Sequence, residues 1–146
     1  MKKVFMAAFM VVAIGSSAFA LDVNKLSYKM KNIFEQEFYG AENVIWSIEE
    51  KYTKASFTMG EEKVQAFFTA EGEMIGFSRY VTLNQLPLNA IQKIKKDYAS
   101  YKVIESIEFN QDGEKSYYVS LQNGEKKQIL NVSLYGAVSI FQSKGK

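Results

Sequence analysis

The sequence predicts an α+β fold in which two tandem helix-plus-four-strand repeats form an antiparallel sheet with the helices on one face. Apolar residues follow the period of a helix face in two segments, and they alternate along eight others as they do in half-buried strands. The order of helix and strands occurs twice, and its turn glycines are 64 positions apart, Gly60 from Gly124 and Gly72 from Gly136. Duplication at a fixed offset favours two copies of one supersecondary unit.

Residues 1–20 have the pattern of a secretory signal peptide. Two lysines precede an apolar run from Val4 to Ile14, and small residues follow as far as Ala18 and Ala20. The apolar run is shorter than the roughly 20 residues that a membrane-spanning helix needs. We therefore expect cleavage after Ala20, a periplasmic or secreted location without stable membrane insertion, and one α+β domain over residues 21–146.

The charge of the mature chain is balanced. The whole sequence has 18 basic and 16 acidic residues, and the signal segment contains two of the lysines and no acid. A balanced charge without a basic stripe gives little attraction for phosphate backbones, so we expect no nucleic-acid partner. The chain has no cysteine, which excludes disulfide bonds and a lipid anchor on an N-terminal cysteine.

The first repeat, about residues 22–80, begins with a helix that Gly40 is expected to end. The apolar positions of this helix are three or four residues apart: Val23, Leu26, Met30, Ile33, Phe34 and Phe38. Strands follow, and the first three alternate apolar residues as Val44, Trp46 and Ile48, then Ala55, Phe57 and Met59, then Val64, Ala66 and Phe68. Turns at Gly60 and Gly72 lead into these strands and into a fourth from Met74 to Tyr80.

The second repeat, about residues 83–142, has the same order. Pro87 suits the first turn of a helix, because its missing N–H is not needed there. The apolar stripe of this helix is Ala90, Ile91, Ile94 and Tyr98. Strands are expected at 102–109, around Tyr117, Val119 and Leu121, at 128–133 and at 137–141. We expect the dipeptide Asn123-Gly124 to form a type I′ hairpin turn, since both residues tolerate positive φ.

The residue types argue against most catalytic chemistry. Histidine and cysteine are absent, which removes the commonest general base, the commonest nucleophile and the usual zinc ligands. The pairs Glu49-Glu50 and Glu61-Glu62 fall at predicted turns, where solvated charges are expected. Residues 110–114 contain oxygen ligands but lack the closing glutamate of a calcium loop, so we interpret them as a turn. We expect no cofactor and no metal; an enzyme would need a cleft where two carboxylates, or a serine and a lysine, converge.

Three residues break the expected alternation on the face away from the helices. Phe67, Tyr118 and Ile129 are apolar or aromatic there, where a solvated sheet face would place polar groups. Such groups suit a protein-binding patch. They could equally pack beneath a loop or against a neighbouring strand. Trp46 and Tyr52 lie nearby in the first hairpin, and a shift of one residue in register decides whether they join the core or the patch.

Several motifs resemble a known family. They are the segment from Ala41 to Trp46, the segment from Val64 to Gly72, Leu86-Pro87, and the segment from Asp97 to Tyr101. In this order they resemble PepSY-like proteins related to the β-lactamase-inhibitor fold, which are secreted bacterial proteins. The resemblance implies tandem repeats with helices on one face of the sheet and a concave open face on the other. In the characterised inhibitor that face grips a β-lactamase, whereas PepSY domains are linked to the restraint of peptidases.

These observations favour an exported non-enzymatic binding protein whose open sheet face engages a protein or peptide partner. An inhibitor of an extracytoplasmic enzyme is one form of this hypothesis, and Arg79 and Tyr80 are further candidate contacts. No inhibitory loop of the family can be matched to this sequence. The alternative is a carrier that holds a small molecule or envelope component between sheet and helices. The sequence leaves the partner's identity open, and an exposed edge strand leaves the oligomeric state open too.

Overall fold

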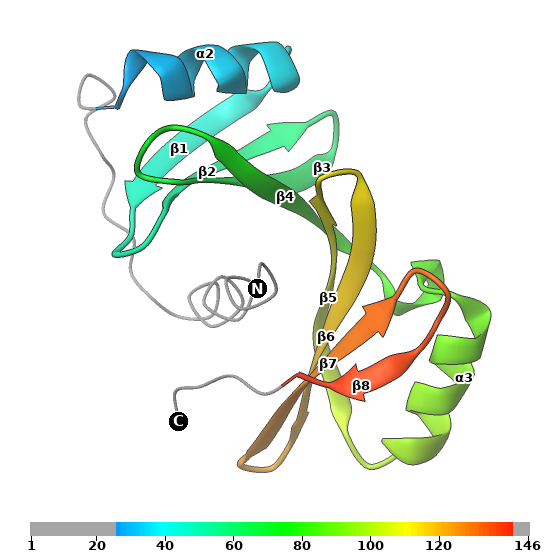
Figure 1. The fold of residues 1–146 in the computed structure, drawn as a ribbon. Helices are drawn as coiled ribbons and strands as arrows, with labels where there is room; N and C mark the ends of the chain where they lie inside the picture. The colour runs from blue at the N-terminus through cyan, green and yellow to red at the C-terminus, as the bar shows by residue number, and fades with distance from the viewer. Residues whose placement is uncertain (1–25, 142–146) are drawn as a thin grey trace. The chain divides into compact units, whose positions relative to one another are not determined.

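The computed structural model describes residues 26–141, and these residues contain two α-helices and an open eight-stranded antiparallel sheet (Figure 1). The strands lie in the sheet in the order of the sequence, from β1 to β8. This confirms the predicted α+β class. The predicted signal peptide and Val23 lie outside the described residues, and the concave form of the open face stays a prediction.

The elements of the first repeat are α2 (Tyr28–Glu37), β1 (Glu42–Ile48), β2 (Thr53–Met59), β3 (Glu62–Phe68) and β4 (Met74–Val81). Those of the second are a short 3-10 helix η2 (Leu83–Gln85), α3 (Leu88–Asp97), β5 (Lys102–Gln111), β6 (Glu114–Asn123), β7 (Lys126–Ser133) and β8 (Val138–Ile140). Each predicted helix and strand is therefore present, and the boundaries differ by a few residues.

The helix starts and ends follow local capping chemistry. The hydroxyl of Ser27 accepts a hydrogen bond of 3.0 Å from the N–H of Met30, which satisfies a donor that the first turn of α2 would otherwise leave open. Pro87 takes the equivalent place before α3, where no N–H is required. Gly40 lies just beyond the end of α2 with a φ of +92°, a conformation that glycine adopts without strain.

The turns before β4 and β8 show the duplication in atomic detail. The N–H of Thr69 donates to Glu73 over 2.8 Å, and the N–H of Gly72 donates to Thr69 over 2.9 Å. Ser133 and Gly136 form the same pair of bonds 64 positions later, both at 3.0 Å. The φ angles of Gly72 and Gly136 are +93° and +92°. The predicted internal repeat is therefore confirmed.

The hairpin turn between β6 and β7 differs from the predicted type. Asn123 remains in β6 opposite Lys126, and Gly124 has the only positive φ of this turn, +63°. That is the pattern of a type II′ turn, so the prediction of a type I′ turn was wrong. Two successive positive φ angles, the mark of type I′, occur instead at Asp112 and Gly113 between β5 and β6.

The core of the first repeat lies between α2 and one face of β1–β4. Aromatic rings fill it: Phe34 lies 5.2 Å from Trp46 and 5.0 Å from Phe57 between ring centroids, and Phe38 lies 4.9 Å from Phe57. The buried residues of this cluster are Leu26, Met30, Phe34, Phe38, Trp46, Ala55, Phe57, Val64, Ala66 and Phe68. Except for Trp46, whose side the pattern left open, these are residues that the helical period and strand alternation predicted for the helix-covered side.

A β-bulge in β1 sets which of its side chains reach this core. Glu42 pairs with Thr58 and Ile45 with Ser56, so β1 has one residue more than β2 between these pairs. Asn43 takes up the extra length with a φ of +57°, and its amide donates to the Thr58 hydroxyl over 3.3 Å. Ile45 therefore shares a face with Ser56, and the next residue in β1 points towards α2.

The second repeat buries an equivalent apolar layer. Val119 pairs with Leu130 and Tyr117 with Val132 across β6 and β7, and all four are buried. The helix α3 lies beside this sheet in Figure 1, and its Ala90 and Ile94 are buried in the same way as Met30 and Phe34 of α2.

The described chain divides into two compact units. One comprises residues 26–81 and 107–115, and the other comprises residues 82–106 and 116–141. The units differ from the sequence repeats because the tip of the β5–β6 hairpin belongs with the first repeat. Gly76 in β4 allows this packing, since its missing side chain makes room for Asn110 and Phe109 of that hairpin.

We expect the substitution Gly76→Ala to destabilise the first unit by about 1–3 kcal/mol, because it overpacks this contact. A Cβ at this position would lie 2.5 Å from the backbone oxygen of Asn110 and 2.9 Å from the ring of Phe109. Urea unfolding checks the prediction, with Ser56→Ala, a change in the half-buried part of β2, as the control. Equal unfolding midpoints for the two variants would contradict it.

Candidate binding face

The side chains of β1–β4 that point away from α2 form the candidate site, which we call the helix-free face. Cross-strand pairs define it, since paired residues lie on the same side of a sheet. Its members are Glu42, Ile45, Ser47, Lys54, Ser56, Thr58, Lys63, Gln65, Phe67, Gly76, Ser78 and Tyr80. All of them belong to the first compact unit.

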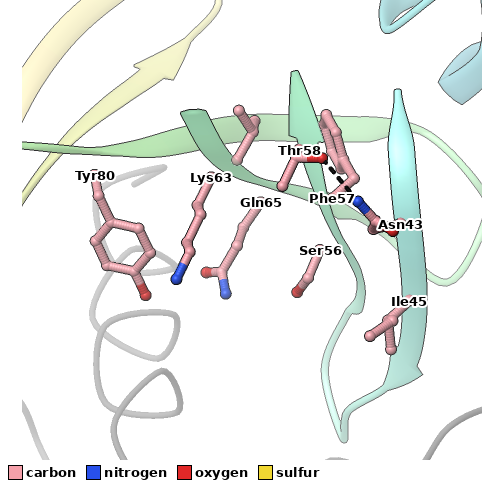
Figure 2. A pocket seen from close by; sticks show the side chains of 9 residues that line it. Asn43, Ile45, Ser56, Phe57, Thr58, Lys63, Gln65 and Tyr80 are labelled. Atoms are coloured by element: carbon pink, nitrogen blue, oxygen red, sulfur yellow. Dashed lines mark hydrogen bonds between the residues drawn. The ribbon is translucent and has the colours of Figure 1, made fainter. Parts of the chain in front are cut away.

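A pocket of about 560 Å³ opens on this face. Its lining comprises Asn43, Ile45, Ser56, Phe57, Thr58, Lys63, Val64, Gln65 and Tyr80. Figure 2 shows the side chains of Ile45, Lys63 and Tyr80 extending from the same side of the strands, whereas the ring of Phe57 extends from the other side into the core. The pocket is therefore a depression on the sheet surface and not a space between sheet and helix.

The lining combines hydrogen-bonding groups with apolar surface. Ile45 is 58% exposed and Tyr80 is 41% exposed, so both are accessible to a partner. Lys63 supplies an exposed amine, Gln65 a half-buried amide, and Ser56 a half-buried hydroxyl. No carboxylate is among the lining residues. This arrangement can receive hydrogen bonds and negative charge, and it lacks the paired acids that glycosidase chemistry needs.

The predicted patch residues Phe67 and Tyr52 lie in the first unit and contact each other. Their ring centroids are 5.6 Å apart, and Phe109 lies 6.1 Å from Phe67. Phe67 is on the helix-free face, as the alternation predicted, because it pairs with Lys54 and Gly76. It is only 3% exposed. Burial, and next the charge of Glu49, raise the pKa of Tyr52 above its ordinary value.

The other two outward candidates lie in the second unit. Tyr118 is buried, and its ring is 5.3 Å from that of Phe141. Burial raises the pKa of Tyr118 to about 12, although its hydrogen bonds with Ser116 and Asn131 act in the opposite direction. Ile129, in the neighbouring strand β7, is half-buried. Tyr118 and Ile129 are diagonal neighbours on one face, because Tyr118 pairs with Asn131.

Trp46 packs in the core, one of the two placements that its pattern left open. It is 6% exposed, and its ring lies 5.2 Å from Phe34 and 5.7 Å from Phe68. Two other residues of the helix-free face were not predicted from the sequence: Ile45, which neighbours Trp46 on the opposite side of β1, and Lys63. The alternation of polar residues at Lys63 and Gln65 was the available signal, because it continues onto the same face as Phe67.

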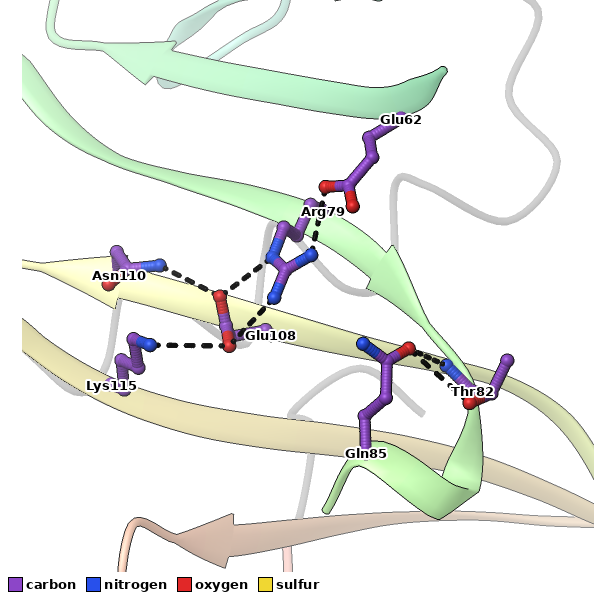
Figure 3. Close-up of polar contacts among 7 residues, drawn as sticks. All are labelled: Glu62, Arg79, Thr82, Gln85, Glu108, Asn110 and Lys115. Carbon is purple, nitrogen blue, oxygen red and sulfur yellow. Dashed lines mark hydrogen bonds and ion pairs between the residues drawn. The ribbon is translucent and has the colours of Figure 1, made fainter. Parts of the chain in front are cut away.

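Ionic side chains gather on the α2 side of the sheet, where Arg79 pairs with Val64 (Figure 3). The guanidinium of Arg79 donates to Glu108 over 2.9 Å and to Glu62 over 2.8 Å. Lys115 lies 3.7 Å from Glu108, and the amide of Asn110 donates to Glu108 over 3.3 Å. The predicted candidate Arg79 is therefore bound within the unit, on the side away from the pocket.

This network keeps a buried carboxylate charged. Burial by itself raises the pKa of Glu108, but the hydrogen bond and charge of Arg79 and the charge of Lys115 outweigh it. The pKa of Glu108 therefore lies below its ordinary value. The hydrogen bonds to Glu108 and Glu62 raise the pKa of Arg79 correspondingly.

Residues 26–141 contain no group of three or more acidic, histidine or cysteine side chains that could hold a metal ion. None of the helices in this described part of the chain is long and apolar enough to cross a membrane.

Comparison with known proteins identifies relatives in fold. No family model and no curated protein matches the chain. A BLIP-like protein from Bacteroides fragilis superposes with a TM-score of 0.71 and 16% identity, covering 83% of this chain and 89% of that one. A DUF2874 family protein from Bacteroides ovatus superposes with a TM-score of 0.69 and 16% identity, and the match covers 80% of this chain and 88% of that one. A Bacteroides eggerthii protein provisionally described as periplasmic superposes with a TM-score of 0.71 and 14% identity, and the match covers 77% of this chain and 85% of that one.

At these identities the likeness shows the fold. It supports the β-lactamase-inhibitor-like part of the predicted resemblance, because one of the similar structures is described as BLIP-like. The PepSY part of the resemblance stays a prediction.

Proposed function

We propose that this chain is an exported periplasmic protein that binds a protein or peptide partner through the helix-free face and catalyses no reaction itself. The observation that carries the proposal is the exposure of Ile45 and Tyr80 beside a pocket on a sheet face that α2 does not cover. Inhibition of an extracytoplasmic enzyme is one form that such binding can take.

The chemistry of this face supports binding. An antiparallel sheet with one solvated face normally places polar residues there. Here a large exposed aliphatic residue and a tyrosine flank amide and hydroxyl groups. Tyrosine is enriched in protein interfaces because it offers apolar area together with a hydrogen-bonding group. The combination suits the recognition of a polypeptide.

Export is supported by two independent observations. The first twenty residues have the pattern of a signal peptide. A protein of similar fold from Bacteroides eggerthii is provisionally described as periplasmic. The proposal that no reaction is catalysed rests on the absence of histidine and cysteine from the sequence and on the absence of carboxylates from the pocket lining. Ser56 and Lys63 both line the pocket, but within residues 26–141 they form no hydrogen bond with each other, as an activated serine would need.

The alternative proposal, a carrier with its ligand between sheet and helices, has less support. In the first unit the space beneath α2 contains aromatic rings whose centroids are 4.9–5.5 Å apart. Rings at such distances are in contact, as in a close-packed protein interior. A carrier would therefore need these side chains to move.

The double variant Ile45→Asp, Tyr80→Ala should lose the partner. Phe67 and Tyr118 are unsuitable for this test, because they are 3% and 1% exposed and their truncation would disturb folding. We expect the mature chain, immobilised, to retain a protein from periplasmic extract of the producing bacterium. The purified partner should then bind the double variant at least about thirtyfold more weakly, the loss of about 2 kcal/mol typical of interface anchors.

The matched control is the variant Tyr28→Ala, Tyr39→Ala. These tyrosines are 77% and 89% exposed and lie on or beside α2, away from the helix-free face. The control should retain the partner with unchanged affinity. Equal binding by the wild type, the double variant and the control would refute the use of this face.

A further inference from the structure

We infer that this protein associates with a second copy of itself, the acidic end of the first unit in one copy binding the basic end of the second unit in the other. The acidic end comprises exposed carboxylates where α2 ends, where β1 begins and at the β2–β3 turn: Glu35, Glu37, Glu42, Glu61 and Glu62. The basic end comprises exposed lysines at the equivalent places of the second unit: Lys95, Lys96, Lys102, Lys126 and Lys127. The inference goes beyond the proposed function and does not depend on it.

The two ends are equivalent parts of the duplicated fold. Where α2 leads into β1, the N–H of Phe38 donates to Phe34 over 2.9 Å and the N–H of Ala41 donates to Phe38 over 3.0 Å. Tyr98 and Tyr101 form the same pair of bonds, at 2.9 and 3.0 Å, between α3 and β5. The connection from helix to strand therefore has the same geometry in both units.

The turns at the two ends are equivalent as well. Gly60 between β2 and β3 has a φ of +62°, and Gly124 between β6 and β7 has a φ of +63°. The residue before each glycine pairs with the residue two positions after it, which is Glu62 in the first turn and Lys126 in the second. These two side chains therefore occupy the same structural position.

Each end joins its segments in one surface. In the first unit Glu42, at the start of β1, pairs with Thr58 close to the β2–β3 turn. In the second unit the amide of Asn123, at the β6–β7 turn, donates to the hydroxyl of Ser100 between α3 and β5 over 3.2 Å. Lys63, which also pairs with Thr58, adds a positive charge to the acidic end and leaves its carboxylates in excess.

The charge is reversed at equivalent positions of the two ends. Three glutamates of the first unit correspond to lysines of the second: Glu35 to Lys95, Glu42 to Lys102 and Glu62 to Lys126. All six side chains are exposed. Surfaces of opposite charge attract and orient each other when two molecules meet. The duplicated ends are therefore complementary between copies.

Most of these charges have no counter-charge in the described part of the chain. Among the residues of the two ends, Glu62 alone forms an ion pair within residues 26–141, with Arg79 at 2.8 Å. Asp97 and Glu125 lie among the lysines of the basic end, and Asp97 already pairs with Lys93 at 2.9 Å. Within this part of the chain, the lysines of the basic end are thus left for an external partner.

Helix stability accounts for the charges of the basic end but not for those of the acidic end. The C-terminal end of a helix carries a partial negative charge, which favours lysines and disfavours glutamates in the last turn. Lys95 and Lys96 occupy the last turn of α3. The last turn of α2 contains Glu35 and Glu37 and no basic residue. Binding to a lysine-rich surface of another copy would offset this unfavourable placement.

Sedimentation velocity of the mature chain tests the inference. Contacts between exposed charges are individually weak, so we expect reversible association at concentrations up to about 1 mM. The weight-average mass should rise with concentration at about 0.05 M salt and return to that of the monomer at about 0.5 M, because salt screens exposed charges. A mass that stays monomeric throughout the low-salt series would overturn the inference.

Two charge-reversal variants locate the contact. Glu35→Lys, Glu37→Lys removes the acidic excess of one end, and Lys95→Glu, Lys96→Glu removes the basic excess of the other. Each variant alone should self-associate at least about tenfold more weakly than the wild type. An equimolar mixture should form a heterodimer, because the first variant keeps an intact basic end and the second keeps an intact acidic end. Association in the mixture also shows that both variants are folded.

The matched control is Glu50→Lys, Glu71→Lys, which makes the same change of net charge at exposed turn positions of the first unit outside the acidic end. It should self-associate as the wild type does. A control weakened as much as Glu35→Lys, Glu37→Lys would contradict a contact between these ends. So would self-association that neither salt nor the two variants change, or a mixture of the two variants that stays monomeric.

Discussion

Replacing Phe34 by alanine should lower the free energy of unfolding by about 3–5 kcal/mol, the usual cost of removing a buried phenylalanine. Phe34 is 6% exposed, and its ring lies 5.0–5.5 Å from the rings of Phe38, Trp46 and Phe57. It joins α2 to two strands of the sheet, so its truncation leaves a cavity that these large rings can fill only by leaving their rotamers.

Urea unfolding of the mature chain measures this effect. Trp46 is the only tryptophan of the sequence and lies beside Phe34, so its fluorescence reports on the packing that the substitution removes. The control is Tyr39→Ala, whose side chain is 89% exposed and whose loss should change the free energy by less than about 0.5 kcal/mol. A Phe34→Ala variant as stable as the control would show that the core beneath α2 is not formed as described.

Replacing Arg79 by methionine should cost about 3 kcal/mol at neutral pH. The variant leaves the carboxylate of Glu108, which is only 5% exposed, without its guanidinium partner. Removal of one member of a buried ion pair is strongly destabilising, because the remaining charge is poorly solvated. Lys115 at 3.7 Å and the amide of Asn110 remain near Glu108. We therefore expect a loss of stability near the lower end of the range for a broken buried ion pair.

The cost of Arg79→Met should decrease on acidification. The pKa of Glu108 in the folded wild type lies below that of an ordinary carboxyl group. The pair therefore contributes stability above the ordinary carboxyl range, and this contribution is lost as the pH falls through the folded-state pKa. Burial raises the pKa of Glu105, with the opposite effect on stability, but Glu105 is common to both proteins and cancels in their difference.

The free energies of unfolding of the wild type and of Arg79→Met, measured from neutral to acidic pH, test how the cost of the substitution depends on pH. The double variant Arg79→Met, Glu108→Gln is the control. Removing both charges should recover part of the loss, since no unpaired charge then remains buried. A difference between wild type and Arg79→Met that stays constant from neutral to acidic pH would mean that Glu108 does not depend on Arg79.

Local patterns were sufficient for the secondary structure and the core of this protein. The spacing of Met30 and Phe34 predicted the buried stripe of α2, and the alternation of Ala55 and Phe57 predicted the inner face of β2. Both patterns succeed because side-chain direction follows directly from helix and strand geometry. The duplicated turn at Gly72 and Gly136 was also predictable, because glycine is favoured where the backbone has a left-handed φ, as it has in each copy.

Details of register were beyond these patterns. The bulge at Asn43 and the type II′ turn at Gly124 each depend on which residue a strand pairs with its neighbour. Pairing is a property of two strands together, and a shift of one residue changes the face of every side chain that follows. Trp46 shows the effect, because its pattern allowed either face until the register of β1 was known.

The candidate site was predictable in orientation and not in accessibility. The sequence placed Phe67 on the face away from α2, and the structure agrees. Its burial against Tyr52 and Phe109 depends on segments distant in sequence. The sequence pattern did not mark Ile45 and Lys63, the exposed residues of the same face, as candidate binding residues, because single apolar and charged residues are common on protein surfaces.

The sequence by itself determined the α+β class, the duplicated order of elements and the residues that face the helices. Each of these follows from the local periodicity of apolar side chains, which any compact arrangement of the chain must satisfy. Only the tertiary structure decided which outward residues remain accessible and that Arg79 compensates the charge of the buried Glu108 carboxylate. Burial and charge compensation are sums over neighbours from distant parts of the chain, so no local pattern contains them.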